Sequence, residues 1–298
     1  MNHSVVVLVS DTHSVLSYNT LIEEAVENIT RDGALDILIT DKITHLNTLD
    51  ATLALAYTLS TEILQRLKKP DVNVTVLFNN HYLESPQDWE LCIVDTSDET
   101  YGAWVYDKKD SLKVLNVQKS STELHPVKDD KDQSQESIHE TSAVGGTFDH
   151  FHDGHKMLLT AAAFVTKTKL IIGVTDHELL KNKKYPELLQ SYDERVKVIT
   201  KFVRRIKPNL NVDPVPIRDV CGPTGTIADI DSLIVSRETI KGAEFINKTR
   251  LERGFSELKV HIINVIGGEE DDGFVNKLSS TQLRKQRWEA SQRTSTEL

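Results

Sequence analysis

Continuous apolar runs and helix-spaced apolar residues alternate along the first part of the chain. β-branched and aliphatic runs of four to seven residues predict strands covered on both faces. These runs lie at residues 5–9, 35–39, 72–78 and 91–94. Apolar residues three and four apart predict helices over 18–29 and 49–67. This region has α/β character, and the sequence contains no internal repeat.

The second half of the chain alternates more regularly between strands and helices. Strands are predicted at 142–148, 169–175, 211–216, 232–235 and 259–265, and helices at 154–166, 192–206 and 238–253. Ser191 and Glu194 fit a capping box before the second helix, and Gly254 fits the end of the third. The order predicts a Rossmann-like parallel sheet that binds ligands at the carboxyl ends of its strands.

A polar segment separates the two halves. Residues 118–141 contain no aromatic residue and three aliphatic ones, together with many charges. Such a segment buries too little apolar surface to offset the entropy of ordering, which predicts a flexible linker. We therefore expect a smaller α/β domain of unknown role at 1–117, a linker at 118–141 and the larger α/β domain at 142–298.

Composition narrows the class of protein. The formal net charge of −10 at pH 7 argues against general nucleic-acid binding. Cys92 and Cys221 provide no disulfide framework, which fits a reducing compartment. We find no apolar run long enough to span a membrane and no signal-peptide pattern at the N-terminus. The expectation is a cytoplasmic protein without nucleic-acid or membrane partners, with a nuclear pool left open.

The segment GGTFDHFHDGH, residues 145–155, carries the strongest chemical signal. It follows a predicted strand and opens a predicted helix, and helix N-termini bind anions through free N–H groups. The paired glycines Gly145 and Gly146 allow close backbone approach, and Gly154 opens the predicted helix. His152 and His155 can donate to charge that develops in a transition state. A zinc site is the weaker alternative because no Cys or Glu joins the histidines at ligand spacing.

Three other segments fall near the same edge of the predicted sheet. They are Ser279, Ser280 and Thr281 with Arg284; Lys181, Lys183 and Lys184; and Ser236 to Thr239, including Glu238. Each has an ordinary structural alternative, which is a serine cap for the first, a solvated lysine cluster for the second and a helix start for the third. Together with the histidine segment they favour a polyphosphate site.

The combination of GTFDxxHxGH and a later SSTxxR element resembles the nucleotidylyltransferase superfamily, whose members have a Rossmann-like fold. The segments at 176–181, 186–190, 192–196 and 222–224, with Val235-Ser236-x-Glu238-Thr239, are similar to eukaryotic, fungal-type pantetheine-phosphate adenylyltransferases. The family often has Arg-Gly-Gly where this chain has Lys241-Gly242-Ala243. No GKS/T P-loop occurs, so the sequence does not carry the kinase step of bifunctional relatives.

The resemblance implies a role for each matching residue. Transfer of the adenylyl group of ATP to 4′-phosphopantetheine would give dephospho-coenzyme A and pyrophosphate, with Mg²⁺ bound to ATP. His155, His152 and Lys183 would be catalytic. The other residues that bind ATP would be Gly146, Gly154, Ser279, Ser280, Thr281 and Arg284, beside His152 and His155. The acceptor would be bound by Thr147, Lys181, Ser236 and Glu238, together with the catalytic Lys183.

Several alternatives stay open. One is an adenylyltransferase or cytidylyltransferase for another acceptor, such as nicotinamide mononucleotide. Another is a scaffold subunit that binds other coenzyme A pathway enzymes. For the first domain, Asp11 and His13 after a strand resemble the opening of a metallophosphoesterase. A non-catalytic domain for assembly or stability is the simpler interpretation, because short motifs recur by chance.

Overall fold

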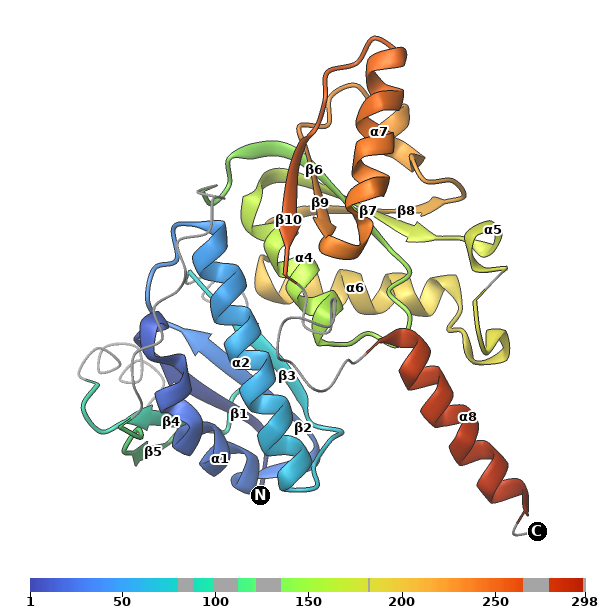
Figure 1. The fold of residues 1–298 in the computed structure, drawn as a ribbon. Coiled ribbons are helices and arrows are strands. Elements are labelled where there is room, and N and C mark those ends of the chain that lie inside the picture. The colour runs from blue at the N-terminus through green and yellow to red at the C-terminus, as the bar shows by residue number, and fades with distance from the viewer. Residues whose placement is uncertain (80–87, 99–111, 122–134, 182, 265–278, 297–298) are drawn as a thin grey trace. The chain divides into compact units, whose positions relative to one another are not determined.

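The computed structural model describes residues 1–79, 88–98, 112–121, 135–181, 183–264 and 279–296. Contacts divide the chain into two compact units, Met1–Gln133 and Ser134–Leu298. Each unit is built on a parallel five-stranded sheet, so the predicted α/β fold is confirmed (Figure 1). Among the described residues, no helix is long and apolar enough to cross a membrane.

The N-terminal unit has the strand order β3-β2-β1-β4-β5. Its central strand β1, Asn2–Val9, is buried from Val5 to Val9, as its continuous apolar run predicts. The amphipathic helices α1, Asn19–Asn28, and α2, Leu46–Arg66, cover the sheet. The other strands are β2, Ile29–Ile39; β3, Asn73–Leu77; β4, Leu91–Asp95; and β5, Lys113–Val117. The sequence pattern does not predict β5, which is a partly exposed strand at the edge of the sheet.

The C-terminal unit has the order β10-β9-β6-β7-β8. Helices α4, Asp153–Val165, and α6, Tyr192–Ile206, lie on one face of the sheet, and α7, Ile240–Glu252, lies on the other (Figure 1). The strands are β6, His139–Gly146; β7, Thr166–Thr175; β8, Asn211–Ile217; β9, Ser232–Ser236; and β10, Lys259–Ile263. The short helix α5, His177–Leu180, follows β7, and α8, Ser280–Thr296, is the last described helix.

Local signals place the ends of these helices. The predicted capping box at α6 is present: Ser191 accepts from the Glu194 N–H, and the Glu194 carboxylate accepts from the Ser191 N–H. After α7, Gly254 adopts a left-handed φ of 77°, and the Phe255 N–H returns to Arg250 O. Helix α6 therefore begins, and helix α7 ends, where the sequence signals predict.

The first described residues of the predicted linker are bound to the N-terminal unit, and the last ones belong to the C-terminal sheet. The Lys119 N–H donates to Asp95, and the Ser120 N–H donates to Ser17 O. At the other end, His139 already pairs with Thr166 in the sheet, so β6 begins three residues before the predicted strand. Residues 122–134 lie outside the described residues, and the flexibility of the linker stays a prediction.

Candidate active site

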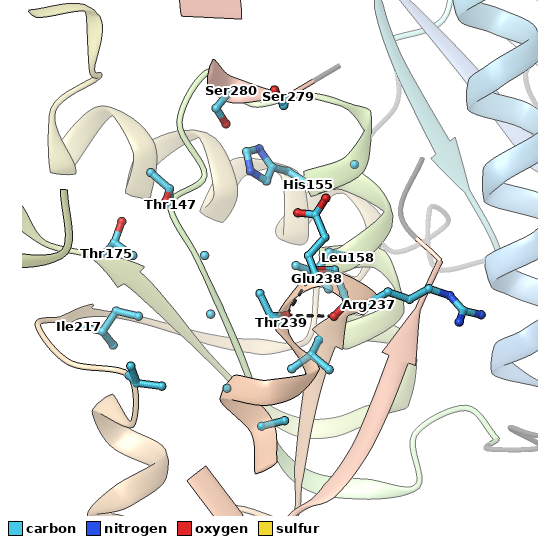
Figure 2. A pocket seen from close by; sticks show the side chains of 18 of the residues that line it. Thr147, His155, Leu158, Thr175, Ile217, Arg237, Glu238, Thr239, Ser279 and Ser280 are labelled. Carbon is cyan, nitrogen blue, oxygen red and sulfur yellow. Dashed lines mark hydrogen bonds between the residues drawn. The ribbon is translucent and has the colours of Figure 1, made fainter. Parts of the chain in front are cut away.

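A pocket of about 530 Å³ opens at the carboxyl edge of the C-terminal sheet (Figure 2). Residues from the ends of β6, β7, β8 and β9 meet there with the N-termini of α4 and α8. Of the predicted site residues, the lining includes Gly146, Thr147, His152, Gly154, His155, Lys183, Ser236, Glu238, Ser279, Ser280, Thr281 and Arg284. The exposed Lys181 is not among them, so its predicted substrate contact is not supported by its position.

The loop after β6 is held in a strained shape. Phe148 and His150 have left-handed φ values of 52° and 46°, a region that side chains with Cβ atoms rarely adopt. The fully buried Phe148 ring lies under Gly146, where an added Cβ would come within 3.0 Å of Phe148 Cζ. Gly146 is therefore needed for a close approach of side chain and backbone, and strain of this kind is concentrated at functional sites.

His152 and His155 stand together at the start of α4. Their rings stack with centroids 3.8 Å apart, and His152 is the N-cap residue of the helix. Burial lowers the pKa of His152 to about 4 and holds the pKa of His155 well below its usual value. Both imidazoles are therefore neutral at pH 7 and can each donate one hydrogen bond to an anion.

Both histidines also carry a buried Nδ1 atom without a hydrogen-bond partner among the described residues. Buried polar atoms are nearly always satisfied in folded proteins, so such an exception points to a ligand site.

Helix α8 brings hydroxyl groups to the same place. Ser280 Oγ lies 3.5 Å from His152 Nε2, and Ser279 Oγ accepts from the Gln282 N–H as the predicted cap. In Figure 2, Ser279 and Ser280 lie next to His155 across the upper part of the pocket. The free N–H groups at the starts of α4 and α8 thus border one cavity, which suits a polyphosphate.

Arg284 lines the pocket as predicted, but its guanidinium is already bound to protein groups. Its side chain is 1% exposed, and its guanidinium is bound to Asp149, to Lys184 O and to Thr281 Oγ1. Asp149 is fully buried and also accepts from the Gln190 N–H. This geometry favours an anchor that joins α8 to the loop after β6, rather than the predicted contact with phosphate.

The sequence prediction missed a second buried arginine. Arg195 donates to Thr147 O, Thr175 O and Gln190 O, and so fixes the ends of β6 and β7. It lies on the stripe of α6 that also contains Ile199 and Phe202. A charged residue on the buried stripe of an amphipathic helix was the signal that could have found it.

The opposite wall is formed by the end of β9 and by apolar side chains. Ser236 Oγ and Thr239 Oγ1 are 3.3 Å apart, and Glu238 points toward the histidine side of the pocket (Figure 2). Arg237, whose guanidinium is bonded to Asn264, points away from the cavity. Apolar surface comes from Leu158, Ile217, Val220, Leu233, Val235, Ala243 and Ile246. The pocket therefore combines a polar end with an apolar wall.

The weaker metal-site interpretation is not supported at the histidines. Within the described parts of the chain, the group with metal-ligand geometry is Asp176, His177 and Glu178. Arg218 pairs with both carboxylates of that group, which makes it an ion-pair cluster beside the pocket.

Residues 143–286, which span this pocket, match the family described as cytidylyltransferase-like. The phosphopantetheine adenylyltransferase of Saccharomyces cerevisiae is 40% identical over 257 residues, which cover 84% of this chain and 82% of the yeast protein. This chain belongs to the phosphopantetheine adenylyltransferase family. The yeast alignment is longer than the C-terminal unit, so this eukaryotic member shares part of the N-terminal unit as well.

Two further relatives show how far the similarity extends. An uncharacterized protein of Schizosaccharomyces pombe is 36% identical over 69% of this chain and 64% of its own length. The phosphopantetheine adenylyltransferase of Thermococcus kodakarensis is 36% identical over 141 residues, which are 47% of this chain and 82% of the archaeal protein. The archaeal member of the family is therefore too short to contain both units.

Proposed function

We propose that the pocket of the C-terminal unit performs the family's reaction. It transfers the adenylyl group of ATP to 4′-phosphopantetheine and releases dephospho-coenzyme A and pyrophosphate. The observation that carries this assignment is the meeting of His152 and His155, at the start of α4, with Ser280, at the start of α8. Two helix N-termini and two neutral imidazoles on one cavity suit the three phosphates of ATP.

The reaction is an in-line displacement at the α-phosphorus. A phosphate oxygen of the acceptor forms the new P–O bond as the bond to the pyrophosphate oxygen breaks. The nucleophile is already an anion, so no general base is required. Thr147 and the backbone at Gly146 hold the acceptor phosphate, and Arg195 fixes the Thr147 carbonyl from behind. His155 and Lys183 stabilise the charge that develops on the α-phosphate and the leaving group.

Mg²⁺ fits this site as a companion of ATP. Glu238 supplies the carboxylate among the described lining residues, and Asp149 is already bound to Arg284. Mg²⁺ retains several waters and binds mainly to phosphate oxygens in such sites, so it needs few protein ligands. When bound, it neutralises triphosphate charge, and Glu238 is the residue placed to approach its waters.

Pyrophosphate release from MgATP tests the assignment. The full-length protein should release pyrophosphate with 4′-phosphopantetheine and not with nicotinamide mononucleotide. Release with the latter acceptor alone would contradict the proposed substrate. A cytidylyltransferase would release pyrophosphate from CTP rather than from ATP. The assay should therefore compare the two nucleotides.

We further propose that the reaction takes place in the cytoplasm. Cys92 and Cys221 are both free, which suits a reducing compartment. Association with other coenzyme A pathway enzymes is a second proposal, for which the N-terminal unit offers a separate folded surface. Pull-down of tagged full-length protein with each purified pathway enzyme tests it.

A further inference from the structure

The two sheets have the same topology. Numbered from the first strand of each unit, both have the order 3-2-1-4-5, with β1 and β6 in the centre. In both, a helix leads from strand one directly into strand two, and another leads from strand two to strand three. The structure thus contains a repeat that the sequence does not display.

The pairing registers repeat as well. Asn2 pairs with Ile29 and His139 with Thr166, so the first residue of each central strand pairs 27 positions further along. Each of these pairs is followed by a register shift, after which Ser4 pairs with Ala34 and Thr141 with Lys169, so the registers of strand two differ beyond this point. On the other side, Val5 pairs with Leu91 and Ser142 with Ser232, in each case the first residue of strand four. A residue in 2–29 therefore has a counterpart numbered 137 higher.

This correspondence aligns the two carboxyl edges residue by residue. Gly145 and Gly146 correspond to Leu8 and Val9, which are buried in the N-terminal core. His152 corresponds to Val15 and His155 to Tyr18, which are 1% and 0% exposed. The space that the pocket leaves open is therefore filled by apolar side chains in the N-terminal unit.

Tyr18 closes the edge with a specific contact. Its hydroxyl accepts from the Ser10 N–H at 3.1 Å and lies 3.1 Å from Ser10 Oγ. Ser10 is the counterpart of Thr147, the residue assigned to the acceptor phosphate. The tyrosine oxygen thus takes the backbone donor that an anion would use.

The charges at this edge also disfavour phosphate. Asp11 caps its own turn by accepting from the His13 N–H and Ser14 Oγ. Asp95, at the end of β4, accepts from the Lys119 N–H, and the Lys119 ammonium lies 3.7 Å from its carboxylate. Burial would raise the pKa of both carboxyls, but these hydrogen bonds and the lysine lower it, so both carry negative charge at pH 7. The positive charge of Lys119 is thus already balanced by carboxylates and is not available to a phosphate.

We propose that the N-terminal unit is a second copy of the nucleotidyltransferase fold whose nucleotide edge is closed, so that each chain binds one ATP. This goes beyond the reaction assigned above, because it concerns the unit that carries no assigned role. The short archaeal family member supports it, since its length leaves room for a single unit.

Two measurements on the full-length protein test the proposal. Isothermal titration with MgATP should give one site per chain. Photolabelling with 8-azido-ATP, followed by peptide mapping, should place the label in residues 134–298. A stoichiometry of two, or label in residues 1–117, would overturn the proposal, whereas the acceptor assay separately tests the reaction of the C-terminal unit.

A matched pair of variants gives a second readout. Ser280→Glu places a negative charge at the start of α8 and should weaken MgATP binding at least tenfold. His13→Glu places the same charge at the exposed edge of the N-terminal sheet and should leave MgATP affinity unchanged. A comparable loss in His13→Glu would show that nucleotide binds near β1 and would refute the closed edge.

Discussion

The segments that connect β1 to β2 and β6 to β7 have the same length and the same place in their sheets, but their first parts do opposite things. After β6, two glycines and a strained Phe148 leave room at the start of α4. After β1, the 3-10 turn Thr12–Tyr18 folds onto the strand end and buries Val15 and Tyr18. The comparison separates what topology supplies, an edge with converging strand ends, from what residues supply, an open or closed site.

The same contrast appears in the polar groups. Around β6, some buried polar atoms are bound in the Asp149–Arg284 and Arg195 contacts. Others, on His152, His155 and Thr175, have no hydrogen-bond partner among the described residues. Around β1, the Tyr18 hydroxyl, Asp11 and Asp95 accept hydrogen bonds from nearby N–H groups. We expect function at the β6 edge to depend on polar atoms that are left unpaired for a ligand, which lowers stability, whereas the β1 edge avoids this cost.

The largest effect is expected from breaking the buried pair of Arg284 and Asp149 at the β6 edge. Arg284→Met leaves Asp149 buried without its charged partner and should destabilise the C-terminal unit by about 3 to 5 kcal/mol. Hydrogen exchange should show loss of protection in α8, with urea unfolding giving the free energy. Lys285→Met, on the exposed side of the same helix, is the control. Unchanged protection of α8 would rule out the anchoring role of Arg284.

Removal of the second histidine tests the open edge directly. His155→Ala should lower kcat by on the order of 10²-fold with smaller changes in KM, because the imidazole acts on charge that develops in the transition state. Steady-state pyrophosphate release measures both constants. His177→Ala removes an exposed imidazole outside the pocket and should keep normal kcat. A near-normal kcat in His155→Ala would contradict its catalytic role.

The pH dependence of stability should differ between the two edges because the β6 edge carries buried histidines, whereas the described histidines near the β1 edge are not buried. The folded pKa of His152, about 4, lies below the value of about 6.5 expected in the unfolded chain. The unfolded chain therefore binds more protons between these values, and stability falls as pH drops from about 6.5 to 4. His152→Asn should reduce this fall by about 3 kcal/mol in urea unfolding. Equal slopes in both proteins would refute the neutral imidazole.

The smallest effect is expected at the closed edge. Tyr18→Phe removes the hydroxyl that satisfies the Ser10 N–H and should destabilise the N-terminal unit by about 1 kcal/mol without changing kcat. Ser10→Ala, which keeps the backbone N–H and its partner, should cost less. Thermal unfolding and pyrophosphate release measure the two quantities. A fall in kcat in Tyr18→Phe would connect this edge to catalysis and break the comparison.

Sequence patterns predicted most strands and helices because buried parallel strands are continuous apolar runs and the helices are amphipathic. Helix α6 matches its predicted bounds, where a capping box and an apolar stripe coincide. Strand β5 escaped prediction because an edge strand need not be apolar on both faces. The roles of Arg195 and Arg284 escaped it too, since a buried arginine is defined by partners distant in sequence.

The sequence by itself determined the α/β class, the glycine-histidine turn at a helix start and the SSTxxR element, because these depend on neighbouring residues. Tertiary structure decided which residues share the pocket, which lysine lines it, and that Arg284 binds Asp149. It also decided that the two halves share one topology. Strand order and register arise from backbone pairing between distant segments, which different side chains can satisfy equally well, so the repeat is visible only in the folded chain.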